Sequence, residues 1–250
     1  MPKKYSKNFL NEVIFQIKYP PILDLYQNKK EVANTFQKGI IEEFPDDLKF
    51  KKNKKITMKL DSATGKPIES NTDDEFYIWT FYNFNGKHVE LNAKQLTLSY
   101  NGELYDNFNS FLEDINLIIS SLENYSVKKA TSIGLRYINQ IKIEDFNNLN
   151  EYINPKLHIT DSIFDEDIIQ SLSRIDLKIK DYNLGFQYGQ FNPEFPNVGS
   201  KKDYILDFDC IYKGNTDLKD ICEVSKEMND IIYNKFEFCI EDKLRDDLNG

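Results

Sequence analysis

Charged and amide side chains recur at alternate positions in three segments that have the pattern of β-strands. Asp207 and Asp209 alternate with apolar neighbours, so both carboxylates leave one face of their strand. Arg136 and Gln140 share a face of a second strand, and Glu12 leaves one face of the first strand. If the three faces lie on the same side of one sheet, we expect a polar binding surface there. Its candidate residues are Glu12, Arg136, Gln140, Asp207 and Asp209.

Two interpretations of these residues remain open at the level of sequence. In the structural one, Arg136 pairs with Asp207 or Asp209, because an unpaired half-buried charge is costly. In the functional one, the polar face binds a ligand or a partner. Asp207 and Asp209 could also contact Mg²⁺ or Ca²⁺, but such ions take more oxygen ligands than one strand supplies. We therefore expect no resident metal or cofactor.

Familiar catalytic patterns are missing from the sequence. It has only two histidines, His88 and His158, whereas a structural zinc site takes about four ligands. Neither histidine accompanies a G-x-S-x-G elbow, and the chain has no glycine-rich phosphate-binding motif. The triplets Asp176-Leu177-Lys178 and Glu241-Asp242-Lys243 resemble parts of metal-dependent nuclease sites, yet they arise by chance in a chain with 41 acidic residues. These observations favour a protein that is not an enzyme.

Composition narrows the class of partner. The chain has 250 residues and a net charge of −9, which disfavours broad contact with a nucleic-acid backbone. Its 18 Phe and 15 Tyr predict a folded protein. The basic run over residues 49–55 is interpreted as a solvated loop before a short strand at 56–60. The alternative is that these lysines join others in a stripe that binds nucleic acid.

The cysteines and the first residues indicate a compartment. Three cysteines without C-x-x-C spacing are typical of a reducing environment. The segment MPKKYSKNFL lacks the apolar core of a secretory signal, and no stretch is long and apolar enough for a membrane span. We expect a cytoplasmic protein that does not contact membranes.

Turn signals between short alternating segments predict an α+β fold rather than an α/β fold. Residues 61–74 have the composition of a mobile hairpin loop. The pattern predicts two βαβββα-like halves, residues 1–128 and 129–250, which form one compact domain. They share a mainly antiparallel sheet with the long helices on one face. Strands are expected at 9–19, 56–60, 75–84, 88–92, 95–100, 131–143, 175–180, 184–191 and 204–212, and long helices at 22–44, from Ser110 to Leu122, and at 218–236.

Three sequence blocks carry a family resemblance. Residues 9–19 are similar to an opening P-I-x-E-A-V-x-E-I-R-F, residues 134–141 to a central G-L-R-Y-I-N-R-I, and residues 206–209 to a late L-D-I-D. The chain thus resembles the sporadically distributed bacterial TIGR04255 family over about residues 8–240. Gln140 stands where that family tends to have Arg, which argues against a paired-arginine anion site.

The resemblance implies no particular activity. The scattered distribution of the family implies a partner-dependent role in a prokaryotic defence or mobile-element system. We therefore expect a protein-interaction or regulatory and sensor module. Its partner is expected to be a protein encoded nearby or a second copy of the chain, since sheet edges need covering. The alternatives are a ligand- or metal-binding enzyme that uses the Arg136 face, or a nucleic-acid-binding component.

Overall fold

The computed structural model describes residues 5–26, 30–46, 48–60, 67–143, 146–158, 168–197 and 202–250. Its description of side chains leaves out residue 30 and residues 53–76. Two sequence predictions therefore fall partly outside the described residues. They are the loop predicted at 61–74, of which residues 61–66 are not described, and a short helical piece that the sequence predicts at 162–172, of which residues 162–167 are not described.

The described chain forms one nine-stranded sheet in the order β2-β3-β4-β5-β1-β6-β9-β8-β7. All neighbouring strands are antiparallel. In each half of the chain the first strand lies at the centre, and the later strands follow outward in reverse order. The strands are β1 (Leu10–Lys18), β2 (Leu48–Leu60), β3 (Pro67–Tyr82), β4 (His88–Leu91), β5 (Gln95–Asn101), β6 (Lys129–Lys142), β7 (Ser171–Ile179), β8 (Tyr182–Phe191) and β9 (Asp203–Asp217).

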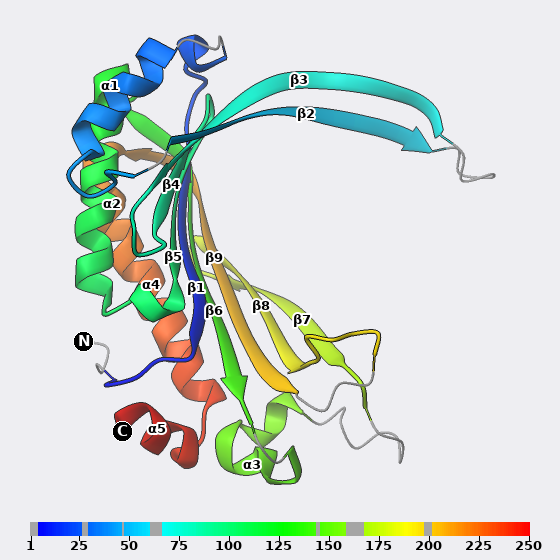
Figure 1. Ribbon diagram of the computed structural model, residues 1–250. Coiled ribbons are helices and arrows are strands. Elements are labelled where there is room, and N and C mark those ends of the chain that lie inside the picture. The colour runs from blue at the N-terminus through cyan, green and yellow to red at the C-terminus, as the bar shows by residue number, and fades with distance from the viewer. Residues whose placement is uncertain are drawn as a thin grey trace.

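The long helices cover one face of this sheet, and the predicted α+β fold is confirmed (Figure 1). They are α1 (Lys30–Ile40), α2 (Phe108–Leu122) and α4 (Ile221–Cys239). The shorter α3 (Leu149–Tyr152) and α5 (Asp242–Asn249) lie at one end of the molecule. The first described residues lie beside α5, where the Ser6 amide donates to the Leu248 carbonyl at 3.0 Å.

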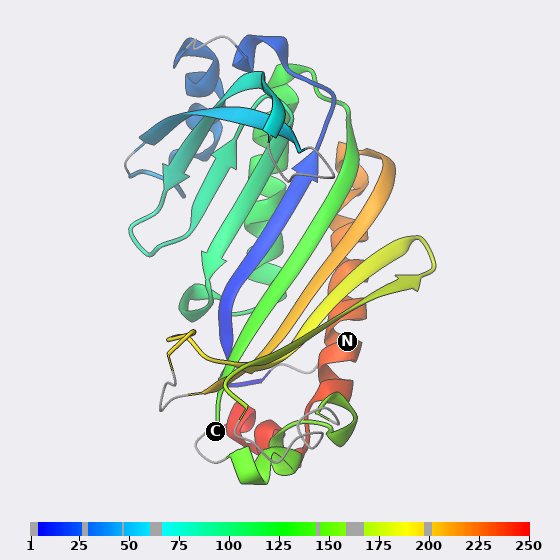
Figure 2. The ribbon, with the colours of Figure 1, turned by 90° about the vertical axis from the view of Figure 1, so that its right-hand side faces the viewer.

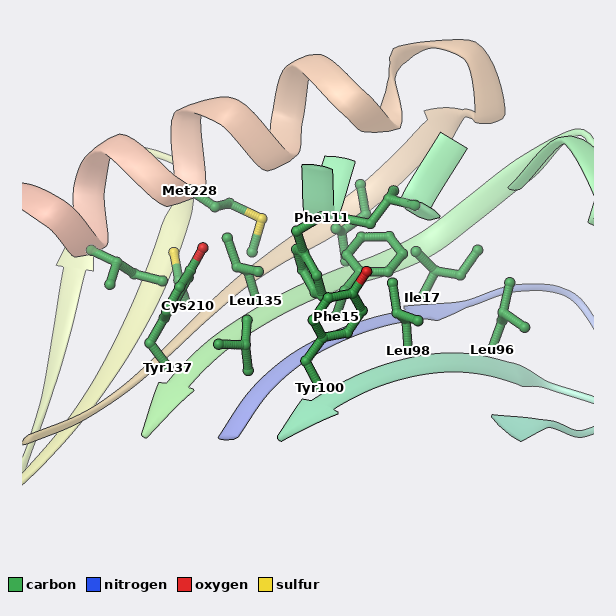
Figure 3. Close-up of a cluster of buried hydrophobic side chains, with 14 of the residues drawn as sticks. Phe15, Ile17, Leu96, Leu98, Tyr100, Phe111, Leu135, Tyr137, Cys210 and Met228 are labelled. Atoms are coloured by element: carbon green, nitrogen blue, oxygen red, sulfur yellow. The ribbon is translucent and has the colours of Figure 1, made fainter. Parts of the chain in front are cut away.

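Strict alternation along the strands builds the core between sheet and helices (Figure 3). On β1, Phe15 and Ile17 are fully buried, whereas their neighbours in sequence point to the other face. Phe111 of α2 and Met228 of α4 are also fully buried and pack against the strands. Each such side chain contributes about 1.5–3 kcal/mol through burial. This packing fixes which side chains leave the opposite face.

The basic run corrects one prediction. Residues 49–55 lie inside β2 rather than in a loop, and β3 already begins at Pro67, within the predicted loop at 61–74. A projecting hairpin has no helix over either face, so its strands need no apolar alternation, and the sequence signal for a strand is weak. At its base Phe50 packs against Trp79, with ring centroids 4.5 Å apart.

Several element boundaries also differ from the predictions, among them those of the first helix, which was expected at 22–44 and is observed as α1 over Lys30–Ile40. Helix α2 begins at Phe108 because the Asn107 side chain accepts from the amides of Asn109 and Ser110 at 2.9 and 3.1 Å. Strand β7 starts at Ser171, before the expected residue 175, and β9 continues to Asp217, beyond its expected end at residue 212. Pairing with a neighbouring strand extends both strands beyond their apolar cores.

Candidate functional site

The face of the sheet opposite the helices, here called the open face, carries no described helix (Figure 2). The sheet curves so that the β2–β3 and β7–β8 hairpins project from this side (Figure 1). The structure places all five predicted site residues on the open face. They come from three adjacent strands: Glu12 from β1, Arg136 and Gln140 from β6, and Asp207 and Asp209 from β9.

Arg136 and Asp207 form a two-pronged ion pair at the centre of the open face. The Arg136 Nε and Nη2 atoms donate to the two Asp207 carboxylate oxygens at 2.8 and 2.6 Å. The Asp207 side chain is 10% exposed and that of Arg136 is 41% exposed, so the guanidinium covers the carboxylate. The hydrogen bond to Asp207 raises the pKa of Arg136 above its ordinary value, although burial opposes it. The predicted pairing of Arg136 is thereby confirmed.

Asp209 lies two residues further along the same strand than Asp207 and has a different environment. It stands opposite Arg136 in the β6–β9 register, but among the described residues no hydrogen-bond donor reaches its carboxylate. Burial raises its pKa above the ordinary value, the Arg136 charge opposes this, and the Asp207 charge adds to it. Asp209 is therefore a half-buried acceptor that faces the open side without a donor from the described chain.

Two further charged residues, which sequence reasoning did not assign to the site, extend this cluster to the sheet edge. On β7, Arg174 Nη2 lies 2.9 Å from Asp176 Oδ1. Gly185 of β8 stands between Asp176 and Asp209 in the register. A Cβ atom at Gly185 would lie 2.6 Å from Arg174 Nη2, so the glycine leaves space for the guanidinium. The signal available in the sequence was the scarcity of arginine: the chain has three, and two of them lie on this face.

The other two predicted residues lie at the margin of the cluster. Gln140 Nε2 donates to Asp203 Oδ2 at 2.6 Å, so this amide serves a different carboxylate from the one that Arg136 holds. Glu12 stands opposite Ile138 in the β1–β6 register, and its charge contributes to the raised pKa of Arg136. The structure thus unites Arg136, Asp207 and Asp209, with Glu12 and Gln140 beside them.

The chemistry available to the open face is that of ion pairing. Within the described ranges, no three histidine, cysteine or acidic side chains stand close enough to hold a metal ion together. His88 lies on β4 against Tyr82, four strands from Asp209, and His158 lies beyond the sheet after α3. The triplet Glu241-Asp242-Lys243 lies at the start of α5, where the Lys243 ammonium group pairs with the Glu151 carboxylate at 2.7 Å.

Comparison of the chain with protein-family models, with curated proteins and with solved structures finds no match. No helix among the described residues has both the length and the apolar character needed to cross a membrane. The geometry of the open face is therefore the basis for a functional inference.

Proposed function

We propose that the protein is a non-enzymatic interaction module whose open face receives a protein partner. The observation that carries this proposal is Asp209, a half-buried carboxylate on the open face with no donor among the described residues. Its strand neighbour Asp207 is satisfied by Arg136, so the cluster presents one acceptor that it does not itself use.

A half-buried charge without a hydrogen bond costs free energy, and a donor supplied from outside removes that cost. The guanidinium of Arg136 is committed to Asp207 and that of Arg174 to Asp176. A lysine or arginine of the partner that reaches Asp209 would complete the cluster. The partner surface that fits is thus basic where it meets Asp209, and arginine is among the residues that protein interfaces favour.

The setting of this module follows from the family resemblance rather than from the geometry. The similarity of residues 134–141 and 206–209 to the TIGR04255 blocks supports a regulatory or sensor role in a prokaryotic defence or mobile-element system. Both blocks contribute to the ionic cluster, through Arg136, Asp207 and Asp209. The cytoplasm is the compartment that this role requires.

The test is to co-express the full chain with the genes that neighbour it and to weigh the purified protein by native mass spectrometry. Asp209→Asn keeps the shape of the side chain but removes its charge. The matched control is Asp230→Asn, the same change at an exposed position of α4. We expect a stoichiometric neighbour protein with the wild type and the control, and its loss with Asp209→Asn.

Other outcomes favour the alternatives. A monomer or homodimer of this chain that retains a small molecule or a metal ion, with no other protein, would contradict the proposal and support a ligand-binding enzyme. Retained nucleic acid whose release depends steeply on salt would support binding through the β2 lysines. The Nζ atom of one of these, Lys49, lies 4.5 Å from the centre of the Tyr82 ring.

A further inference from the structure

Strand β7 forms one edge of the sheet, and no described strand pairs with its outer side. Arg174, Ile175 and Asp176 are all exposed on this strand, and Ile175 is 43% exposed. An edge of nine residues presents a row of backbone donors and acceptors to any strand that can align with it. Figure 2 shows this strand lying across the front of the open face.

The β7–β8 turn determines which backbone groups point outward. Lys180 and Asp181 form a two-residue turn between the paired residues Ile179 and Tyr182. In such a hairpin the closing pair exchanges hydrogen bonds, and hydrogen-bonded pairs alternate along the ladder. The backbone groups of Ile175 therefore point toward β8. Those of Arg174 and Asp176 point away from the sheet.

We propose that two copies of this chain join through β7, as antiparallel strands related by a two-fold axis at Ile175. This register places Arg174 of each copy opposite Asp176 of the other, with both side chains on the open face. The outward backbone groups of these residues then exchange hydrogen bonds. On the helix side, the two Ile175 side chains meet at the axis and cover each other's exposed surface.

The sequence of β7 selects this register over the neighbouring ones. An axis at Arg174 would place two guanidinium groups opposite each other, and an axis at Asp176 would place two carboxylates opposite each other. An axis between residues would set outward-pointing backbone groups against inward-pointing ones, so no ladder could form. The charges that deter an unrelated strand from this edge therefore complement a second copy.

Such a dimer closes on itself because each copy uses its one β7 edge. The two sheets become continuous, with the helices of both copies on the same side and the two open faces side by side. The paired edges bring Arg174 and Asp176 of both copies into one neutral group of four charges. This self-pairing uses the sheet edge and does not depend on the partner proposed for Asp209.

The test uses two charge-reversal variants of the full chain, Arg174→Asp and Asp176→Arg, whose masses are measured by light scattering after gel filtration. Both side chains are more than half exposed, so we expect both variants to fold. We expect the wild type to have twice the chain mass and each variant alone to have the mass of one chain. An equimolar mixture of the two variants should regain the dimer, because each new aspartate then faces a new arginine.

The matched controls are Lys129→Asp and Asp217→Lys, which reverse an exposed ion pair of 3.6 Å between β6 and β9. These controls should remain dimeric. A monomeric wild type would overturn the proposal. So would single variants that remain dimeric, which would place the interface elsewhere, or a mixture that stays monomeric. Because misfolded chains could not form a dimer on mixing, recovery of the dimer in the mixture would show that both variants are folded.

Discussion

Asp207 and Asp209 lie two residues apart on one face of one strand, yet their surroundings give them different roles. Asp207 accepts both prongs of Arg136 and is almost covered by it. Asp209 is half-buried beside the same arginine and receives no hydrogen bond from the described residues. The first carboxylate stabilises the sheet, whereas the second adds a cost that a partner can remove. Substitutions at these positions should therefore change stability in opposite directions.

Arg136→Ala removes two charge-assisted hydrogen bonds and leaves the Asp207 carboxylate, 10% exposed, without its donor. We expect a loss of about 1–3 kcal/mol in the free energy of unfolding, measured by urea titration near neutral pH. Lys226→Ala is the control, because its pair with Glu223 on α4 is exposed and should contribute nothing measurable. Equal losses in the two variants would contradict the structural role of Arg136.

Asp209→Asn should stabilise the protein near neutral pH. The folded-state pKa of Asp209 lies above the ordinary value of 3.8. Between pH 3.8 and the folded-state pKa, the native state therefore binds a proton that the unfolded state has released. The stability that Asp209 contributes is therefore complete below pH 3.8 and is lost as the pH rises through the folded pKa. The asparagine variant does not titrate and escapes this loss.

The measurement is the free energy of unfolding of wild type and Asp209→Asn across the acid range. Their difference should favour the variant at neutral pH and should shrink as the pH falls toward the ordinary aspartate pKa. A variant less stable than the wild type at neutral pH would show that Asp209 already has a stabilising partner. A gain in stability together with a loss of partner binding is the pattern expected of a functional carboxylate.

At the scale of single residues, the sequence predicted what depends on alternation alone. Because side chains alternate along a strand, Asp207 and Asp209 could be placed on one face, and the pairing of Arg136 followed from the cost of an unpaired charge. Arg174 could not be placed, since its position over Gly185 depends on the β7–β8 register. The contact between Gln140 and Asp203 could not be predicted because it depends on the β6–β9 register.

At the scale of elements, two glycines show how closely the strands approach one another. Gly102 follows β5, and a Cβ atom there would lie 1.7 Å from the backbone oxygen of Leu10 in β1. Gly134 lies on the open face of β6, where the nearest atom to an added Cβ, the Gln16 carbonyl oxygen, is 3.8 Å away. The first glycine is required by backbone contact, whereas the second is not.

Gly102→Ala should therefore destabilise the protein by about 3 kcal/mol, the upper range for overpacking, because backbone atoms cannot yield as a flexible side chain does. Gly134→Ala should raise stability by about 0.5–1 kcal/mol, since alanine loses less conformational freedom in a strand. Thermal or urea unfolding of both variants checks the contrast. A tolerated alanine at 102 would contradict the contact between β1 and the end of β5.

The sequence predicted whether an element is a helix or a strand where one face of it is buried. It did not predict the lengths of the elements. The alternation of β1 and β6 reflects helices that pack on one side only. The residues through which β2 and β3 pair show no such alternation. Their lysine-rich or polar stretches were therefore assigned to loops. Strand pairing satisfies backbone groups whatever the side chains are, so hydropathy alone could not show these extensions.

At the scale of the whole molecule, the projecting part of the β2–β3 hairpin is separable from the fold. Strand β4 pairs with β3 only from Trp79 to Tyr82, so the described residues of β3 before Trp79 pair with β2 alone. The projection leaves the sheet on the side of the open face (Figure 1). It is therefore positioned to contact whatever binds there.

Replacing residues 54–75 by an Asn-Gly turn between Asn53 and Phe76 should leave the thermal unfolding midpoint nearly unchanged. The buried side chains of Trp79 and Phe81 and the packing of Phe50 on Trp79 all remain. The same variant should retain less of the co-purified partner in native mass spectrometry. A large fall in the midpoint would show instead that the projection belongs to the folded core.

The central claim is that the partner lies on the open face, and carboxylate footprinting by mass spectrometry tests it most directly. The complex and the chain alone are labelled with a carbodiimide and an amine, and the modification of each acidic residue is compared. We predict protection of Glu12 and Asp209 on the open face, with Glu223 on α4 and Asp242 at the start of α5 labelled equally in both samples. Protection of Glu223 with unchanged labelling of Asp209 would place the partner on the helices and contradict the account.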